Sequence, residues 1–168
     1  MRWLLVLMFG VVACAPPARP APSPTTAPAP LEGAVLGATK ASWVAAKGEP
    51  SKGPVQLYDR FGRDLDVLWR AYGDGEERAH QVELVLPQEQ PVARARELAK
   101  SLLPRDAAVV RTYTAPAGQT VEVFKSAALA EALGADPFGG DEPGTFIQIA
   151  ERRTPRTTRV VIAVGNRP

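Results

Sequence analysis

The sequence predicts an α+β fold in which short helices pack on one face of an antiparallel sheet. Short, capped helical segments are separated by runs of alternating apolar and polar residues, which are typical of half-buried strands. No series of parallel strand–helix–strand units is present, so neighbouring strands are expected to run antiparallel. Residues 31–168 are long enough to bury one apolar core, and we expect a single α+β domain there. An alternative arrangement is two helix-plus-hairpin modules in tandem.

The first helix is expected over residues 40–47. Thr39 is suited to the N-cap, Gly48 ends the helix, and Pro50 prevents its continuation. Alternating apolar and polar residues then predict strands at residues 55–59, 65–69 and 82–86. A Gly-Asp-Gly turn at residues 73–75 separates the last two of these strands.

Pro91 opens the longest predicted helix, which ends before Pro104. Ser126 caps a third helix over residues 127–133, and Gly134 ends it. The buried stripe of the longest helix is expected to contain Val92, Ala95, Leu98, Ala99 and Leu102. Further strands are expected at residues 109–113, 120–124, 145–151 and 158–164. The predicted order is therefore α-βββ-α-ββ-α-ββ.

Residues 1–13 resemble the signal peptide of a bacterial lipoprotein. Arg2 supplies the positive start, and residues 3–12 form an apolar run too short to span a bilayer. Residues 11–14 read Val-Val-Ala-Cys and resemble the lipobox, in which the signal is cut before an acylated cysteine. The resemblance implies that Cys14 carries fatty acids such as palmitate and anchors the chain to a membrane. The alternative is an ordinary secretory signal with an incidental cysteine.

Residues 14–30 are expected to be the lipidated cysteine followed by a linker. Seven of the sixteen residues from Ala15 to Pro30 are proline, a composition that favours an extended chain over a packed core. At about 3.1 Å per residue, this spacer reaches roughly 50 Å from the lipid. A proline-rich docking motif is the alternative. Because Ala15 is not aspartate, the resemblance to lipoproteins implies the outer membrane in a Gram-negative cell.

Composition excludes several kinds of site. Cys14 is the only cysteine, so the chain can form neither an internal disulfide nor a thiolate metal site. The sequence predicts no cofactor and no metal centre. His80 is the only histidine, and it is interpreted as a structural residue at the end of a core-facing strand. The loop at residues 134–144 carries Asp136, Asp141 and Glu142, for which calcium binding is weighed against ordinary loop chemistry and partner contact.

Four arginines cluster around the turn of the last predicted hairpin: Arg152, Arg153, Arg156 and Arg159. Such a cluster is suited to contact with anionic lipid, an acidic glycan or an acidic patch on a protein. We predict that these arginines form the partner-binding surface. The alternative is a solvated edge that discourages aberrant strand pairing. Nucleic acid is not an expected partner, since no nucleic-acid-binding motif accompanies them.

Residues 37–50 resemble the start of the small SmpA/OmlA-type lipoproteins, which support assembly of outer-membrane proteins. Gly37, Thr39, Trp43, Gly48 and Pro50 fall at that family's offsets for the cap, the apolar anchor and the end of a helix. The resemblance implies a non-enzymatic role, and it transfers no catalytic residue. It covers about 50 residues of the mature chain.

A second set of residues repeats the plan with shifted spacing: Ser126, Leu129, Leu133, Gly134 and Pro137. Tandem modules of this kind are similar to the secreted β-lactamase-inhibitor proteins. The predicted function is therefore a membrane-anchored envelope lipoprotein that binds a protein and is not an enzyme, as an accessory of outer-membrane assembly. The alternative is an inhibitor or regulator of an extracytoplasmic hydrolase. A hydrolase itself ranks third, because no nucleophile motif accompanies His80.

Overall fold

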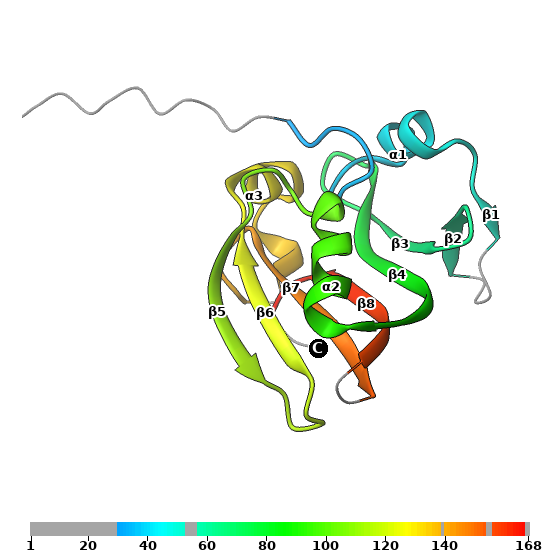
Figure 1. Cartoon of the computed structure of the whole chain (residues 1–168). Helices are drawn as coiled ribbons and strands as arrows, with labels where there is room; N and C mark the ends of the chain where they lie inside the picture. The colour runs from blue at the N-terminus through cyan, green and yellow to red at the C-terminus, as the bar shows by residue number, and fades with distance from the viewer. Residues whose placement is uncertain (1–29, 53–56, 139, 154–155, 167–168) are drawn as a thin grey trace, which may run out of the picture.

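The computed structural model describes residues 30–52, 57–138, 140–153 and 156–166 (Figure 1). They form one antiparallel sheet of eight strands in the order β1-β2-β3-β4-β8-β7-β6-β5, together with three α-helices. The predicted mixed α+β class is confirmed. The helices are α1 (Lys40–Lys47), α2 (Val92–Ala99) and α3 (Ala127–Leu133), and α2 continues as the short 3-10 helix η1 (Lys100–Leu102). The strands are β1 (Ser51–Lys52), β2 (Tyr58–Phe61), β3 (Leu65–Ala71), β4 (Glu77–Pro91), β5 (Ala108–Thr114), β6 (Thr120–Lys125), β7 (Thr145–Arg153) and β8 (Arg156–Val164).

Helix α1 begins and ends where its local signals place it. The hydroxyl of Thr39 accepts a hydrogen bond from the backbone N–H of Ser42 at 3.2 Å, and Gly48 is the C-cap. The strand predicted at residues 55–59 is only partly confirmed, since β2 begins at Tyr58 and residues 53–56 lie outside the described ranges.

Before α1, the chain passes tightly over α3 at Gly37. The backbone N–H of Gly37 donates to the carbonyl of Ala79 at 2.9 Å. Its φ of +80° is unfavourable for other residues, and a Cβ there would lie 2.3 Å from Cδ1 of Leu129. Glycine at this position is thus required both by the backbone conformation and by packing.

The buried stripe of α2 differs from the prediction at one position. Ala95 and Ala99 are fully buried, as expected, but Leu98 is 41% exposed. The buried line follows positions i and i+4, and Leu98 falls at its border. The two small alanines allow α2 to pack closely against β4, β7 and β8.

Helix α3 matches the predicted bounds and caps. The Ser126 hydroxyl accepts from the N–H of Leu129 at 3.0 Å, and Gly134 is the C-cap. Gly144 lies directly behind this cap, where an added Cβ would be 2.1 Å from the carbonyl oxygen of Ser126. The start of α3 therefore packs directly against the residues that begin β7.

One large core cluster contains buried residues from all three helices and from most strands. Trp43 of α1 lies at its centre, with its ring 5.3 Å from that of Phe61 and 6.1 Å from that of Trp69. In the other half of the sheet, the rings of Phe124 and Phe146 stack at 5.1 Å. Trp43 is fully buried, and Trp69 is partly buried and packs against the same cluster.

A second, smaller cluster is formed by side chains of β6 and β7 that alternate with those of the large core. Val121 pairs with Ile149, and Val123 pairs with Ile147. These residues are buried, and Tyr113 and Ala163 pack against them. Among the described residues, no helix has the length and apolar character needed to cross a bilayer.

Candidate functional site

Arg159 is held on the surface of the sheet by a buried carboxylate. Its guanidinium donates through Nη2 to Oε2 of Glu83 on the neighbouring strand β4. The side chain of Glu83 is 7% exposed, whereas that of Arg159 is 39% exposed. A buried acid therefore orients an accessible base.

A second pair repeats this arrangement two strands away. Arg60 on β2 donates from Nε and Nη2 to the two carboxylate oxygens of Asp66 on β3, both at 2.7 Å. The Asp66 side chain is 6% exposed and that of Arg60 is 31% exposed. This two-point geometry fixes the guanidinium plane and is among the stronger polar contacts in proteins.

The two acids lie opposite each other, since Asp66 and Glu83 are direct partners in the β3–β4 register. Like charges at opposed positions destabilise a sheet, and here each carboxylate has its own arginine. Removing one member of such a buried pair leaves an uncompensated charge. The two ion pairs consequently depend on each other.

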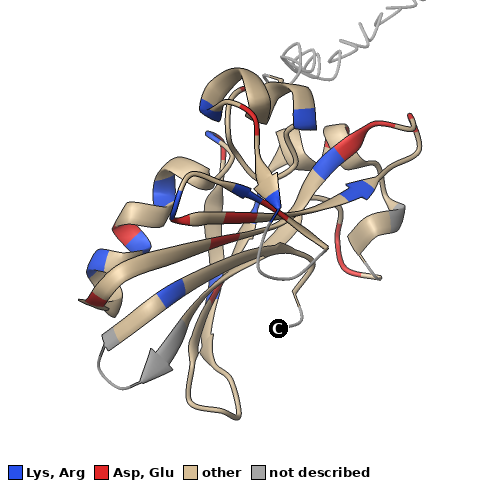
Figure 2. Cartoon of the chain, turned by 90° about the vertical axis from the view of Figure 1, so that its right-hand side faces the viewer, with Lys and Arg blue, Asp and Glu red and all other residues tan. Residues whose placement is uncertain are grey.

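Tyr58 and Gln81 complete the group. The Gln81 amide donates to Oε1 of Glu83 at 2.7 Å and to the Tyr58 hydroxyl at 3.2 Å. Burial and, next, the nearby Glu83 carboxylate raise the pKa of Tyr58, so it stays a neutral phenol. We call the set of Tyr58, Arg60, Asp66, Gln81, Glu83 and Arg159 the arginine network. Blue and red segments lie close together on neighbouring strands in Figure 2.

The predicted partner-binding arginines are described at one position only. Arg159 belongs to the arginine network, but the side chains of Arg152, Arg153 and Arg156 lie outside the described part of the structure. Backbone register places Arg153 opposite Arg156 in the β7–β8 hairpin. Cys14 also lies outside the described ranges.

Sequence analysis missed the acids and the tyrosine of the network. Asp66 and Glu83 read as ordinary solvent-facing positions of alternating strands, yet both are buried. One signal was available, because Arg60 and Asp66 flank the short turn at residues 62–64 at positions that a tight hairpin brings opposite each other.

His80 does not occupy the expected end of the core face. A β-bulge intervenes: Gln81 pairs with Leu68 and Ala79 pairs with Trp69, so His80 is the extra residue. Ala79 takes the fully buried position, and Nδ1 of His80 lies 2.8 Å from the Tyr72 hydroxyl. Burial lowers the pKa of His80 and raises that of Tyr72 to about 12, which keeps both rings uncharged.

The carboxylates of the loop at residues 134–144 are engaged in local contacts. Asp141 accepts from the backbone N–H of Asn166 at 2.9 Å, and Glu142 pairs with Lys125. The side chain of Asp136 is not described. Within the described ranges, no group of three or more histidine, cysteine or acidic side chains is placed to hold a metal ion.

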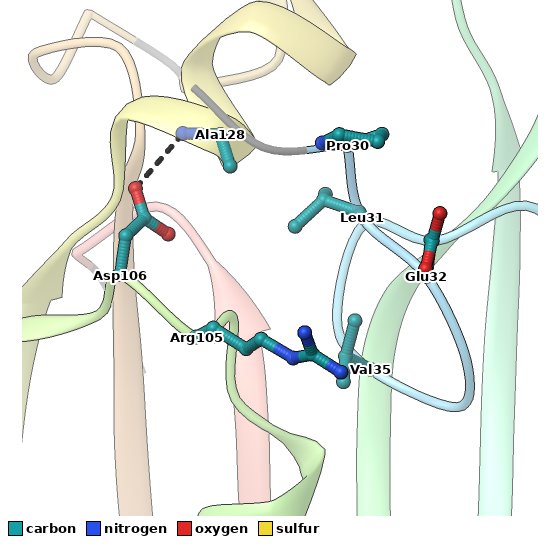
Figure 3. A pocket seen from close by; sticks show the side chains of 7 residues that line it. All are labelled: Pro30, Leu31, Glu32, Val35, Arg105, Asp106 and Ala128. Carbon is teal, nitrogen blue, oxygen red and sulfur yellow. Dashed lines mark hydrogen bonds between the residues drawn. The ribbon is translucent and has the colours of Figure 1, made fainter. Parts of the chain in front are cut away.

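A small cavity of about 210 Å³ lies where the chain emerges at Pro30, between α3 and the loop before β5 (Figure 3). Asp106 at its edge accepts from the Ser126 hydroxyl at 2.6 Å and from the N–H of Ala128 at 3.0 Å. Burial opposes ionisation, but these donors keep the pKa of Asp106 below its ordinary value. Both oxygens of Asp106 are thus used to fasten α3, and the cavity has no catalytic arrangement among its described residues. Its lining consists of Pro30, Leu31, Glu32, Val35, Arg105, Asp106 and Ala128.

In comparisons with known proteins, no family model, no curated protein and no solved structure matches this chain. The likeness of residues 37–50 to the SmpA/OmlA-type lipoproteins therefore remains a resemblance of a short motif. The arginine network and the surfaces around it are the remaining features that bear on function.

Proposed function

We propose that the protein is a lipid-anchored lipoprotein of the cell envelope that binds another protein and is not an enzyme. Cys14 carries the anchor, and the proline-rich linker holds the domain away from the lipid. In a Gram-negative cell the location is the outer membrane, and the role is that of an accessory to outer-membrane assembly. This role follows from the resemblance of residues 37–50.

The observation that carries the binding proposal is the pair of arginines fixed by buried acids. The side chains of Arg60 and Arg159 are 31% and 39% exposed, and each donates to a buried acid, Asp66 or Glu83. Arginine is enriched among residues that dominate protein interfaces, and a fixed side chain loses little entropy when a partner binds. The network therefore supports recognition of carboxylates on an acidic protein surface.

We further propose that the helices pack on one face of the sheet and that the opposite face is the working surface. The arginine network and the second cluster of β6 and β7 share that opposite face, as the registers across the sheet indicate. Arg152, Arg153 and Arg156 are kept in this proposal as partner contacts.

A second candidate is an inhibitor or regulator of an extracytoplasmic hydrolase. It is favoured by the strand order, in which β1–β4 and β5–β8 form two four-stranded meanders joined at β4 and β8. Two helix-plus-hairpin modules in tandem are the arrangement in which the chain is similar to the β-lactamase-inhibitor proteins.

Chemical cross-linking in intact cells that produce the acylated protein tests the proposal, with partners identified by mass spectrometry. The wild type is compared with Arg60→Ala/Arg159→Ala and with the matched surface control Arg63→Ala/Arg70→Ala. We expect links to outer-membrane assembly proteins, lost in the network variant and kept in the control. Links only to a soluble hydrolase would favour the second candidate. Links that both variants keep would refute the arginine network as the binding surface.

A further inference from the structure

The two edges of the sheet are protected very differently. β1 has only two residues, Ser51–Lys52, and such a short edge offers little to pair with. β5 at the other edge has seven residues, and within the described chain only β6 pairs with it. It contains neither proline nor lysine, the residues that often block an exposed edge. β5 therefore presents a row of backbone donors and acceptors on its outer side.

The side chains of β5 are also unusually exposed for a strand. Six of its seven residues are exposed, and Tyr113 is the one exception. Val109 is 54% exposed and Val110 is 59% exposed. A β-bulge between Val109 and Arg111 leaves Arg111–Thr114 as the regular part of the edge. The two adjacent valines lie at this bulge and expose apolar surface beside the regular part of the edge.

An open groove of about 620 Å³ lies beside the first residues of β5. This volume falls in the range of roughly 300–1,000 Å³ that is typical of ligand pockets. When a strand adds to a sheet edge, backbone hydrogen bonds give affinity and pockets for alternate side chains give specificity. The groove can receive one apolar side chain of an added strand. Its apolar lining includes Val35, Leu103, Ala107, Val109 and Phe124.

Two arginines lie at this edge. Arg105 lines the groove together with Glu32, and the guanidinium of Arg111 lies 5.1 Å from the centre of the Tyr113 ring. Neither arginine forms an ion pair within the described residues, whereas the groove residue Lys100 pairs with Glu97 at 2.7 Å. Two copies of β5 paired with each other would bring like charges onto one short ladder, which is unfavourable. Charge therefore favours an acidic strand over a second copy.

We propose that β5 accepts an extended, acidic strand of a partner protein, with one apolar side chain in the groove and carboxylates facing Arg105 and Arg111. The inference rests on the proposed protein-binding function, but the site is separate from the arginine network. The sheet order places β5 at one end and the network strands β2 and β3 near the other.

The test uses the full acylated chain in detergent and a short fluorescent peptide that alternates glutamate with valine. Fluorescence anisotropy measures binding, and hydrogen exchange locates it. We expect saturable binding that protects β5 amides, and that falls about tenfold or more in Arg111→Glu and in Val110→Glu. The matched controls are Arg63→Glu and Leu57→Glu, at exposed positions next to β2 near the other end of the sheet. A peptide with the same side chains but with every backbone amide N-methylated should not bind, because neither of its edges can donate to the ladder.

Absence of saturable binding, or equal binding of the N-methylated peptide, overturns the proposal. Self-association of the chain that Val110→Glu abolishes would identify a second copy as the occupant and would also overturn it. If the in-cell links depend on Arg60 and Arg159 but the peptide does not bind, this inference is wrong and the network proposal stands. If the peptide binds and Arg60→Ala/Arg159→Ala keeps every in-cell link, the network proposal fails alone.

Discussion

The same sheet carries two very different regions on the face of the arginine network. In one region, the buried acids Asp66 of β3 and Glu83 of β4 form ion pairs with Arg60 of β2 and Arg159 of β8. In β6 and β7, the equivalent positions hold valine and isoleucine, including Val121 and Ile147, which are almost fully buried. β8 joins the two regions, since Arg159 contacts Glu83 and Ala163 packs on the apolar cluster.

Because of this difference, we expect one region to contribute mainly to stability and the other to contribute mainly to partner recognition. Apolar residues stabilise a fold by leaving water, so the β6–β7 region is expected to contribute mainly to folding. Partly buried ion pairs contribute little net stability because desolvation offsets their attraction, but they fix charged groups in defined positions. We expect the network region to contribute mainly to partner binding.

The largest effect is expected from Ile147→Ala in the apolar region. Ile147 is 1% exposed, and truncation of such a residue leaves a cavity that costs about 2–5 kcal/mol. Urea unfolding should show this loss of unfolding free energy. Partner capture, measured as in-cell cross-links formed by the folded protein, should stay unchanged. A loss smaller than that of Val161→Ala, at a partly buried position, would contradict the division of the face into two regions.

A smaller loss is expected from Glu83→Leu in the network. The change removes the carboxylate that accepts from Arg159 and Gln81, and a hydrogen bond to a charged group contributes about 1.5–3 kcal/mol. In contrast to Ile147→Ala, this variant should lose partner capture. The double variant Glu83→Leu/Arg159→Leu should recover part of the stability and none of the capture. Additive losses would show that the two side chains are not coupled.

The N-caps of α1 and α3 extend the comparison to the stability contributed by single side chains. Thr39→Ala should cost about 1 kcal/mol through loss of the hydrogen bond to Ser42. Ser126→Ala should cost more, because Ser126 is buried and also donates to Asp106. Thermal unfolding of both variants measures the difference. Equal losses would mean that the Asp106 contact adds nothing to the cap.

The smallest effect concerns pH. Burial lowers the pKa of His80 in the folded state, so the unfolded chain binds a proton more readily, near pH 6.5. Stability should therefore be full above that pH and should fall as the pH decreases toward the folded pKa. Urea midpoints at pH 7.5 and 5.5 should differ more for the wild type than for His80→Gln. The same pH dependence in both proteins would remove His80 as the cause.

The helices could be predicted well because their signals are local in the sequence. The arginine network and the bulge could not, because they depend on which strands pair. Thr39 and Ser126 cap helices through residues three positions away, so their roles can be read directly from the chain. Glu83 and Arg159 are 76 residues apart, and only the adjacency of β4 and β8 brings them together. The bulge at His80 likewise depends on how β4 pairs with β3, which strand periodicity alone does not specify.

Site-specific photo-cross-linking tests the central claim that the arginine network contacts the partner. A photoreactive amino acid is placed at Tyr58 in the network and, as the control, at the exposed Ala46 on α1. We predict a covalent adduct from position 58 that disappears when Arg159→Ala is added, and none from position 46. An adduct from position 46 alone, or one from position 58 that is insensitive to Arg159→Ala, would contradict the account.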